Sequence, residues 1–137
     1  MGPILNILIS LTAHSEIINK YEYDTLLANC IYESASVSHE EKVAIAHVVL
    51  NRVSDKRWGQ TITKVVFAPA QFSWTAETHL REPSLREKRD CHKAVQDALS
   101  GKGRHSYNHY YLASIDTPKW AKGSEGTLID QHIFMEL

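Results

Sequence analysis

The strongest constraint on the fold is an apolar stretch in the middle of the chain, at residues 43–53. Its hydrophobic side chains are spread over most faces of a helix: Val43, Ala44, Ala46, Val48, Leu50 and Val53. Just before it, Ser38 and Glu41 have the spacing of a capping box, in which two side chains satisfy backbone N–H groups at a helix start. We therefore predict a helix from residue 38 to about residue 53. Because so little of its surface is polar, we expect other elements to surround it at the centre of the fold.

Weaker patterns predict further helices on either side of the central one. Asp24 or Thr25 can cap a helix after a polar break at residues 19–22, and its apolar residues are Leu26, Leu27, Ile31 and Ala35. A short helix is expected at residues 61–67, ending before Pro69, followed by a structured loop at residues 71–83. Residues 84–99 have a helical period that ends at Gly101 and Gly103, with Leu85, Ala94, Val95, Ala98 and Leu99 facing inward.

After residue 106 the pattern changes to short runs rich in aromatic and β-branched residues, which favour strands. The residues concerned are Tyr107, Tyr110, Tyr111 and Leu112, followed by Leu128, Ile129, Ile133 and Phe134. The sequence thus predicts an α+β fold that is mainly helical and ends in a small antiparallel β ribbon. At 137 residues the chain has the length of one domain, so we expect residues 1–137 to fold as a single unit.

The first 13 residues are mostly apolar, but no Lys or Arg precedes the apolar run. They therefore lack the charged region of an ordinary secretory signal. The run is also shorter than the roughly 20 residues that span a bilayer. We favour an N-terminal apolar helix or extension within residues 1–23 that docks on the body, over an export or anchor segment, and we expect no stable membrane span.

The overall charge excludes one class of partner. The 15 basic and 16 acidic side chains leave a formal net charge of −1, so the chain lacks the electrostatic footprint of a nucleic-acid-binding protein. We expect no nucleic-acid partner. The two cysteines, Cys30 and Cys91, leave two alternatives open: a disulfide formed in an oxidising compartment, or two small buried apolar residues.

Glu33 is the first candidate for chemistry. It lies near the end of the first predicted helix among apolar and small neighbours. Apolar surroundings favour the neutral form of a carboxyl, because desolvation penalises the charge. A carboxyl that keeps its proton near neutral pH can protonate a glycosidic oxygen. The alternative is an ordinary exposed helix glutamate.

The second candidate is the segment Gln71, Phe72, Ser73 and Trp74 in the predicted loop. Aromatic faces stack on pyranose rings, and amide and hydroxyl groups pair with sugar hydroxyls, so the combination suits a sugar site. The alternative is that Phe72 and Trp74 fill the core beneath the loop. The eight histidines suggest zinc, but His105 and His109 lie in a non-helical segment with no acidic residue at the position that H-E-x-x-H requires. We predict neither a metal site nor a cofactor.

Several blocks of the sequence together resemble the SleB-type cell-wall hydrolases, a family of spore cortex-lytic enzymes and phage or bacterial muralytic proteins. The blocks are Tyr32-Glu33-Ser34-Ala35, the run A-H-V-V-L-N-R-V at residues 46–53, Q-F-S-W at residues 71–74, Asn108-His109-Tyr110-Tyr111, Pro118-Lys119-Trp120 and residues 129–134. The resemblance covers about residues 26–137, in the family's order. It implies a lysozyme-like helical body and cleavage of the bond between N-acetylmuramic acid (MurNAc) and N-acetylglucosamine (GlcNAc) in peptidoglycan.

The resemblance also implies the site residues. Counting back from Asn51 and Arg52 places Glu33 on the family's catalytic glutamate, whereas the family's A-R-G-E segment becomes Ser34-Ala35-Ser36-Val37 and its second glutamate is absent. The expected substrate-binding residues are Gln71, Phe72, Ser73, Trp74, Glu77, His109, Tyr110, Trp120 and His132. Asn51 and Arg52 are expected to be structural, tying loop carbonyls near the end of the central helix.

With one carboxyl, the favoured reaction is lytic transglycosylation, in which the nucleophile is the muramyl C6 hydroxyl and Glu33 is both acid and base. Hydrolysis by a muramidase would require a second carboxylate, for which Glu77 and then Asp130 are the candidates. Two further alternatives are a peptidoglycan-binding domain without activity and a zinc-dependent amidase. We expect a monomer that acts on glycan strands in the periplasm or outside the cell. The small size favours a phage endolysin, made in the host cytoplasm.

Overall fold

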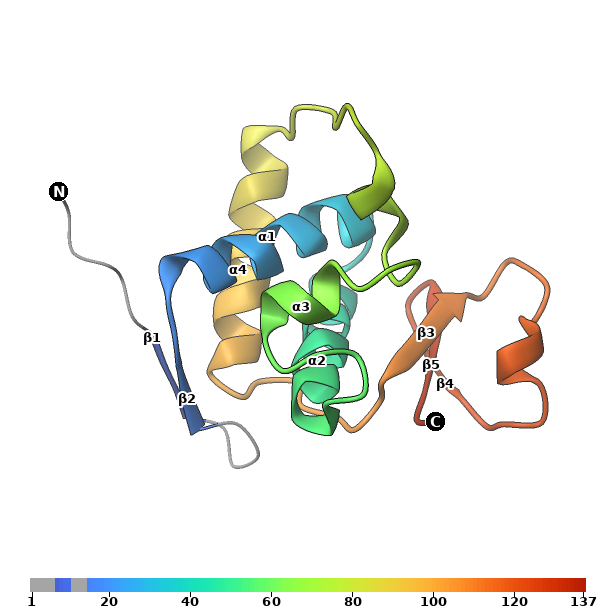
Figure 1. The fold of residues 1–137 in the computed structure, drawn as a ribbon. Coiled ribbons are helices and arrows are strands. Elements are labelled where there is room, and N and C mark those ends of the chain that lie inside the picture. Colours follow the sequence, from blue (N-terminus) through green and yellow to red (C-terminus); the bar gives the residue numbers. More distant parts are fainter. Residues whose placement is uncertain (1–6, 11–14) are drawn as a thin grey trace, which may run out of the picture.

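The computed structural model describes residues 7–10 and 15–137, and within them helices make up most of the body (Figure 1). The elements are β1 (Ile7–Ser10), β2 (Ser15–Ile18), α1 (Lys20–Ser34), α2 (His39–Asp55), α3 (Ile62–Val66), η1 (Ser73–Ala76), α4 (Leu85–Leu99), β3 (His109–Leu112), η2 (Lys119–Ala121), β4 (Thr127–Ile129) and β5 (His132–Met135). The prediction of a mainly helical α+β fold with a C-terminal antiparallel sheet is confirmed.

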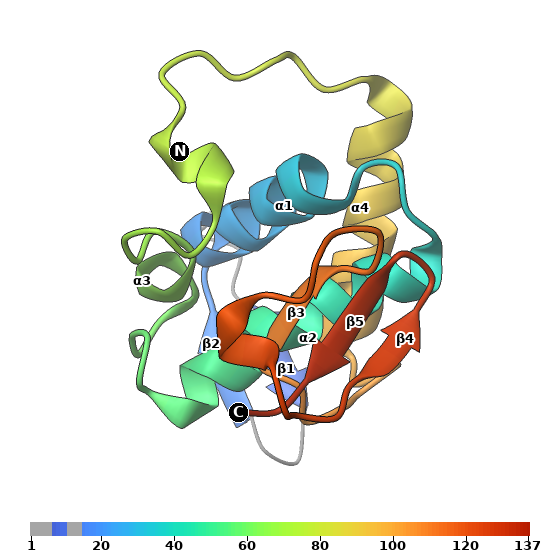
Figure 2. The same ribbon diagram turned by 90° about the vertical axis from the view of Figure 1, so that its right-hand side faces the viewer.

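Helix α2 is the central element, as predicted. Every residue from 41 to 50 is buried, because α1, α3 and α4 pack around it on one side and the C-terminal sheet covers the other (Figures 1 and 2). The helix ends at Lys56, whose φ of 72° is the left-handed conformation common after helices.

At the start of α2, one of the two hydrogen bonds of the predicted capping box is present and the other is replaced. The Ser38 hydroxyl accepts a hydrogen bond from the Glu41 N–H at 3.1 Å, as expected. The return contact to the Ser38 N–H comes from the carboxylate of Asp130 at 2.8 Å, not from Glu41. The Glu41 side chain turns inward and is fully buried. The turn between β4 and β5 therefore caps the central helix.

Helix α1 begins earlier than the pattern indicates. Its cap is Asn19, which accepts from the Glu22 N–H at 3.0 Å, so the polar residues expected to be a break form the first turn. Tyr23 in that turn is buried in the core, so its packing adds to the Asn19 cap in stabilising the earlier start. Near the other end, Cys30 forms a disulfide with Cys91 of α4, which settles the alternative left open above.

Helix α4 has the reciprocal capping box that α2 lacks. Ser84 accepts from the Glu87 N–H at 3.1 Å, and the Glu87 carboxylate accepts from the Ser84 N–H at 2.8 Å. The predicted inward positions are buried at Ala94, Val95, Ala98 and Leu99. The prediction that Leu85 faces inward is wrong, because it is the first residue of α4 and is 73% exposed.

The expected N-terminal helix is wrong for Ile7–Ser10, which form a strand paired antiparallel with β2 in the register Ile7 to Ile18. A short apolar run has no period that separates a strand from a helix. The rest of that predicted helix, residues 1–6 and 11–13, lies outside the described residues. Within the described part of the chain, no helix has both the length and the apolar character needed to cross a membrane.

The C-terminal sheet has the order β3-β5-β4, with both pairs antiparallel. Tyr110 of β3 lies opposite Phe134 of β5, and Leu112 lies opposite His132. Phe134 is fully buried against Ala44 and Val48 of α2, so this face of the sheet packs on the central helix. Tyr110 and His132 share that face, because strand side chains alternate with a period of two.

Candidate active site

Glu33 lies in the last turn of α1 and is half-buried. The hydroxyl of Tyr110, on β3, donates a hydrogen bond of 2.6 Å to its Oε1 atom. The other oxygen, Oε2, accepts no hydrogen bond from any described residue. One oxygen is therefore fixed by the protein, while the other is available to a substrate.

The electrostatic surroundings of Glu33 favour its protonated form. Burial raises the pKa of its carboxyl above the ordinary value, and this outweighs the Tyr110 hydrogen bond and the positive charges of His132 and Arg52, which lower it. The same pairing holds the pKa of Tyr110 well above its usual range, through burial and the nearby Glu33 charge. The alternative of an ordinary exposed glutamate is wrong.

Asn51 and Arg52 tie loop carbonyls at the end of α2, as predicted. The Asn51 amide donates to the carbonyl oxygens of His105 at 2.9 Å and Tyr107 at 2.8 Å. Arg52 Nε donates to the Asn108 carbonyl at 2.8 Å, which sets the path of the chain into β3. Arg52 also contacts Gln71 Oε1 at 3.2 Å and contributes positive charge at Glu33. It therefore links the scaffold to the site.

The segment at residues 71–74 divides into two kinds of residue. Phe72 is 2% exposed and Trp74 is 7% exposed; the Trp74 indole donates to Asn29 Oδ1 at 2.8 Å. The prediction that these two rings bind sugar is wrong, because their faces pack in the core beneath the loop. Gln71 and Ser73 are exposed and stay candidates for pairing with sugar hydroxyls.

His109 and Trp120 lie together in a row of aromatic rings. The ring centroid of His109 is 5.5 Å from that of Trp58 and 5.1 Å from that of Trp120, and Tyr111 lies 5.8 Å from Trp120. Trp120 is 47% exposed. Trp58 and Tyr111 belong to this row but were not among the predicted site residues. Trp58 follows the central helix in a loop with no period, so only its residue type could have marked it as a candidate.

His132 lies on β5, beside the tyrosine that donates to Glu33. Its Nδ1 atom is 2.7 Å from Glu41 Oε1, and its ring meets the Tyr110 ring edge-on, with centroids 5.3 Å apart. The structure therefore brings Tyr110 and His132 to Glu33.

The candidates for a second carboxylate each lie in a different environment from Glu33. Glu77 is exposed where η1 ends, Asp130 caps α2, and Glu41 is fully buried. No acidic side chain of the described residues is among the groups that shift the pKa of Glu33. The site thus presents one carboxyl with cationic and hydroxyl neighbours.

The described residues contain no group of three His, Cys, Asp or Glu side chains arranged to hold a metal ion. The two histidines of the zinc hypothesis have other partners: His105 Nε2 lies 2.8 Å from the Ala44 carbonyl oxygen, and His109 Nδ1 lies 2.8 Å from Asn108 Oδ1.

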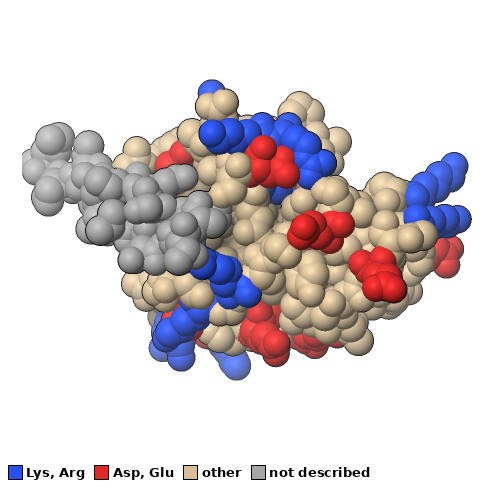
Figure 3. Space-filling view, turned by 90° about the horizontal axis from the view of Figure 1, so that it is seen from below, with Lys and Arg blue, Asp and Glu red and all other residues tan. Residues whose placement is uncertain are grey.

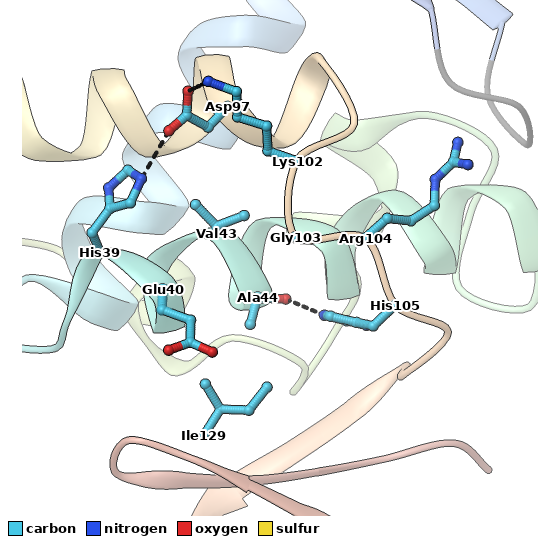
Figure 4. A pocket seen from close by; sticks show the side chains of 10 residues that line it. All are labelled: His39, Glu40, Val43, Ala44, Asp97, Lys102, Gly103, Arg104, His105 and Ile129. Atoms are coloured by element: carbon cyan, nitrogen blue, oxygen red, sulfur yellow. Dashed lines mark hydrogen bonds and ion pairs between the residues drawn. The ribbon is translucent and has the colours of Figure 1, made fainter.

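A cavity of about 530 Å³ lies elsewhere, between the first turns of α2, the loop at residues 102–105 and Ile129 (Figure 4). Its charged rim is partly paired, since Asp97 contacts both His39 at 2.8 Å and Lys102 at 3.4 Å. None of the predicted site residues lines this cavity. On the face seen from below, basic and acidic side chains are interspersed on a largely uncharged surface (Figure 3).

Comparison with known proteins gives consistent matches. The model of the Cell Wall Hydrolase family matches residues 36–135. A spore cortex-lytic enzyme of Bacillus cereus is 33% identical over 99 residues, covering 69% of this chain and 36% of that protein. The Bacillus subtilis spore cortex-lytic enzyme is 30% identical over 114 residues, covering 81% of this chain and 36% of that protein. The chain thus spans about a third of the length of these relatives.

Solved structures match over nearly their whole length. The catalytic domain of the Bacillus cereus SleB protein superimposes with a TM-score of 0.69 at 30% identity, covering 85% of this chain and 91% of that one. The catalytic domain of a germination-specific lytic transglycosylase, SleB from Bacillus anthracis, gives a TM-score of 0.68 at 29% identity, with 84% and 94% covered. The fold is therefore that of these catalytic domains.

Proposed function

The chain belongs to the cell wall hydrolase family, and we propose that it cleaves peptidoglycan glycan strands at the MurNAc–GlcNAc bond as a lytic transglycosylase. The observation that carries the proposal is the environment of Glu33: a half-buried carboxyl with a raised pKa, one oxygen held by Tyr110 and the other without a hydrogen bond from any residue that the structure describes. The relative described as a lytic transglycosylase supports the same reaction.

Glu33 acts twice in the proposed reaction. Protonated on Oε2, it donates to the glycosidic oxygen as the bond to the muramyl C1 atom breaks and positive charge develops on the ring. The resulting carboxylate then removes the proton from the C6 hydroxyl of the same sugar. The C6 oxygen bonds to C1, a 1,6-anhydro ring forms, and Glu33 regains its proton without consuming water.

The single carboxyl favours transglycosylation over hydrolysis. A hydrolase that uses two carboxylates holds them at a defined separation across the bond, and no acidic group of the described residues is among those that shift the pKa of Glu33. The C6 hydroxyl belongs to the substrate itself, so its effective concentration is high without a protein base to position a water. Hydrolysis by way of Glu77 is the outcome that the experiment below distinguishes.

The substrate lies, in this proposal, across Gln71, Ser73, Tyr110 and the aromatic row of His109 and Trp120. Exposed rings can stack on sugars, as Trp120 is placed to do. We propose further that the protein works as a monomer on the wall from the periplasmic or outer side, and that it serves a phage as an endolysin.

The test is mass spectrometry of the soluble products from purified sacculi, with wild type, Glu33→Gln and Glu77→Gln side by side. We expect muropeptides ending in 1,6-anhydro-MurNAc from wild type and Glu77→Gln, and none from Glu33→Gln. The glutamine variant keeps the shape of the side chain and an oxygen for Tyr110, so its loss of activity isolates the proton.

Other results would replace the proposal. Reducing-end products that disappear in Glu77→Gln would make the protein a two-carboxylate muramidase. Binding of sacculi without any product from folded wild type would make it a wall-binding domain. Released peptides, abolished by a chelator, would make it an amidase.

A further inference from the structure

Glu41 is a buried charged group that the proposed reaction leaves without a role. It is 0% exposed, and burying a carboxylate costs free energy unless it is paired and hydrogen-bonded. Its Oε1 atom accepts from the Gln131 N–H at 3.0 Å and lies 2.7 Å from His132 Nδ1. Its Oε2 atom has no partner among the described residues.

Helix capping does not account for Glu41. The side chain that a capping box would use at the Ser38 N–H is supplied by Asp130, and Ser38 itself serves the Glu41 N–H. The carboxylate is directed away from the helix end and toward β5. What it holds there is the imidazole of His132.

His132 connects this buried carboxylate to the catalytic acid. It lies diagonally across the strand pair from Tyr110, on the sheet face that packs against α2. The imidazole edge meets the Tyr110 ring at 5.3 Å between centroids, and Phe134 packs on the same tyrosine at 5.4 Å. Tyr110 in turn donates to Glu33 at 2.6 Å. The contacts run without a break from Glu41 to Glu33.

We propose that Glu41 and His132 form a positioning pair: the buried carboxylate fixes the His132 ring, and the ring fixes Tyr110 and through it the Glu33 carboxyl. This role rests on the proposed function for its catalytic meaning. Neither residue is proposed as a catalytic residue, because Glu41 is fully buried and the His132 side chain, which the sequence predicts to bind substrate, is only 13% exposed.

The charged and titratable groups around Glu33 come from three elements. Tyr110 faces it from β3, His132 from β5 and Arg52 from α2. Arg52 has its own ties to Asn108 and Gln71, so a change at Glu41 leaves that cation in place. The position of the His132 ring is what depends on Glu41, since its Nδ1 atom lies 2.7 Å from that carboxylate.

The experiment is an NMR titration of the Glu33 side-chain carboxyl carbon in the whole chain, for wild type, Glu41→Gln and His132→Gln. Ser84→Ala is the matched control, because it destabilises the α4 cap without touching the pair. In Glu41→Gln we expect the ionisation constant of Glu33 to fall about threefold or more, because Tyr110 is no longer held by the His132 ring and its hydrogen bond, which favours the ionised carboxylate, weakens. Removing a buried negative charge with no effect on His132 would change it in the opposite direction.

The two substitutions should share one effect. His132→Gln should lower the ionisation constant of Glu33 to a similar extent, and the double variant should go no further than the larger single change. On solubilised glycan strands, Glu41→Gln should lower kcat about tenfold or more with little change in KM. Ser84→Ala should lower Tm only.

An unchanged or increased ionisation constant for Glu33 in folded Glu41→Gln would overturn the pair, as would additive effects in the double variant. If Glu41→Gln does not fold, His132→Gln decides the question by the same titration. The titration needs no substrate. If wild type releases no product from sacculi, the proposed function is refuted, but the titration still tests whether Glu41 and His132 position Glu33.

Discussion

Replacing Tyr110 with phenylalanine removes a single hydroxyl, the one that donates to Glu33 at 2.6 Å. Hydrogen bonds to a charged partner are worth about 1.5–3 kcal/mol, and each 1.36 kcal/mol corresponds to a factor of ten in an ionisation constant. The hydroxyl stabilises the ionised carboxylate, so its loss favours the proton. Because Glu33 is half-buried, we take the lower end of that range and expect the ionisation constant of Glu33 to fall about tenfold.

Two measurements check this expectation. The alkaline limb of the pH–rate profile should move to higher pH, because Glu33, the proposed acid, keeps its proton to a higher pH. The maximum rate should fall as well, since Oε1 is no longer held. Carbon NMR of the Glu33 carboxyl should show the same displacement without substrate.

Tyr107→Phe is the matched control for this change. Tyr107 donates to Thr127 at 2.9 Å in the same sheet and has no contact with Glu33. It should leave both measurements unchanged. An alkaline limb that stays in place in Tyr110→Phe, or moves to lower pH, would refute the account of how Glu33 is tuned.

Three further outcomes follow from the contacts described above. Because the Cys30–Cys91 disulfide has a sequence separation of 61, its removal by paired alanine substitution should cost about 4 kcal/mol in urea unfolding, and a loss below about 1 kcal/mol would contradict the chain-entropy argument. Ser84→Ala should cost about 1 kcal/mol by the same measurement and leave product release unaltered. Since the pKa of Glu33 is raised, its contribution to stability is present at low pH and is lost as pH rises from about 4.5 through the folded-state pKa. Glu33→Gln should therefore have a higher Tm than wild type at neutral pH and a similar Tm below pH 4.5, and a lower Tm at neutral pH would count against the burial argument.

Local sequence patterns predicted a helix or strand correctly where a single apolar face or a single capping residue determines where the element forms. The apolar run at residues 43–53 defined the central helix because no arrangement of it on a surface is favourable. Apolar neighbours along α1 made Glu33 a candidate beside the alternative of an ordinary exposed glutamate, and the family resemblance then favoured it over the other glutamates. Asn51 and Arg52 were interpreted correctly from their place at a helix end.

The errors share a physical cause, which is that a partner distant in sequence overrides a local pattern. Glu41 fits a capping box, yet His132, 91 residues away, takes its carboxylate. Trp74 fits a sugar-binding loop, yet Asn29 on α1 holds its indole in the core. Leu85 has the right period for the core, but the core ends before the first turn of α4. No pattern within one segment contains that information.

The hydrogen bond between Glu33 and Tyr110 joins positions 77 residues apart in the chain, and this separation has a consequence during synthesis. Glu33 leaves the ribosome long before β3 exists, and His132 emerges later still. Until the last strands dock on α2, the carboxyl lacks both the hydroxyl that orients it and the charge that tunes it. A nascent chain that ends before β3 therefore lacks the hydrogen bond that orients the Glu33 carboxyl, even if α1 and α2 have already folded.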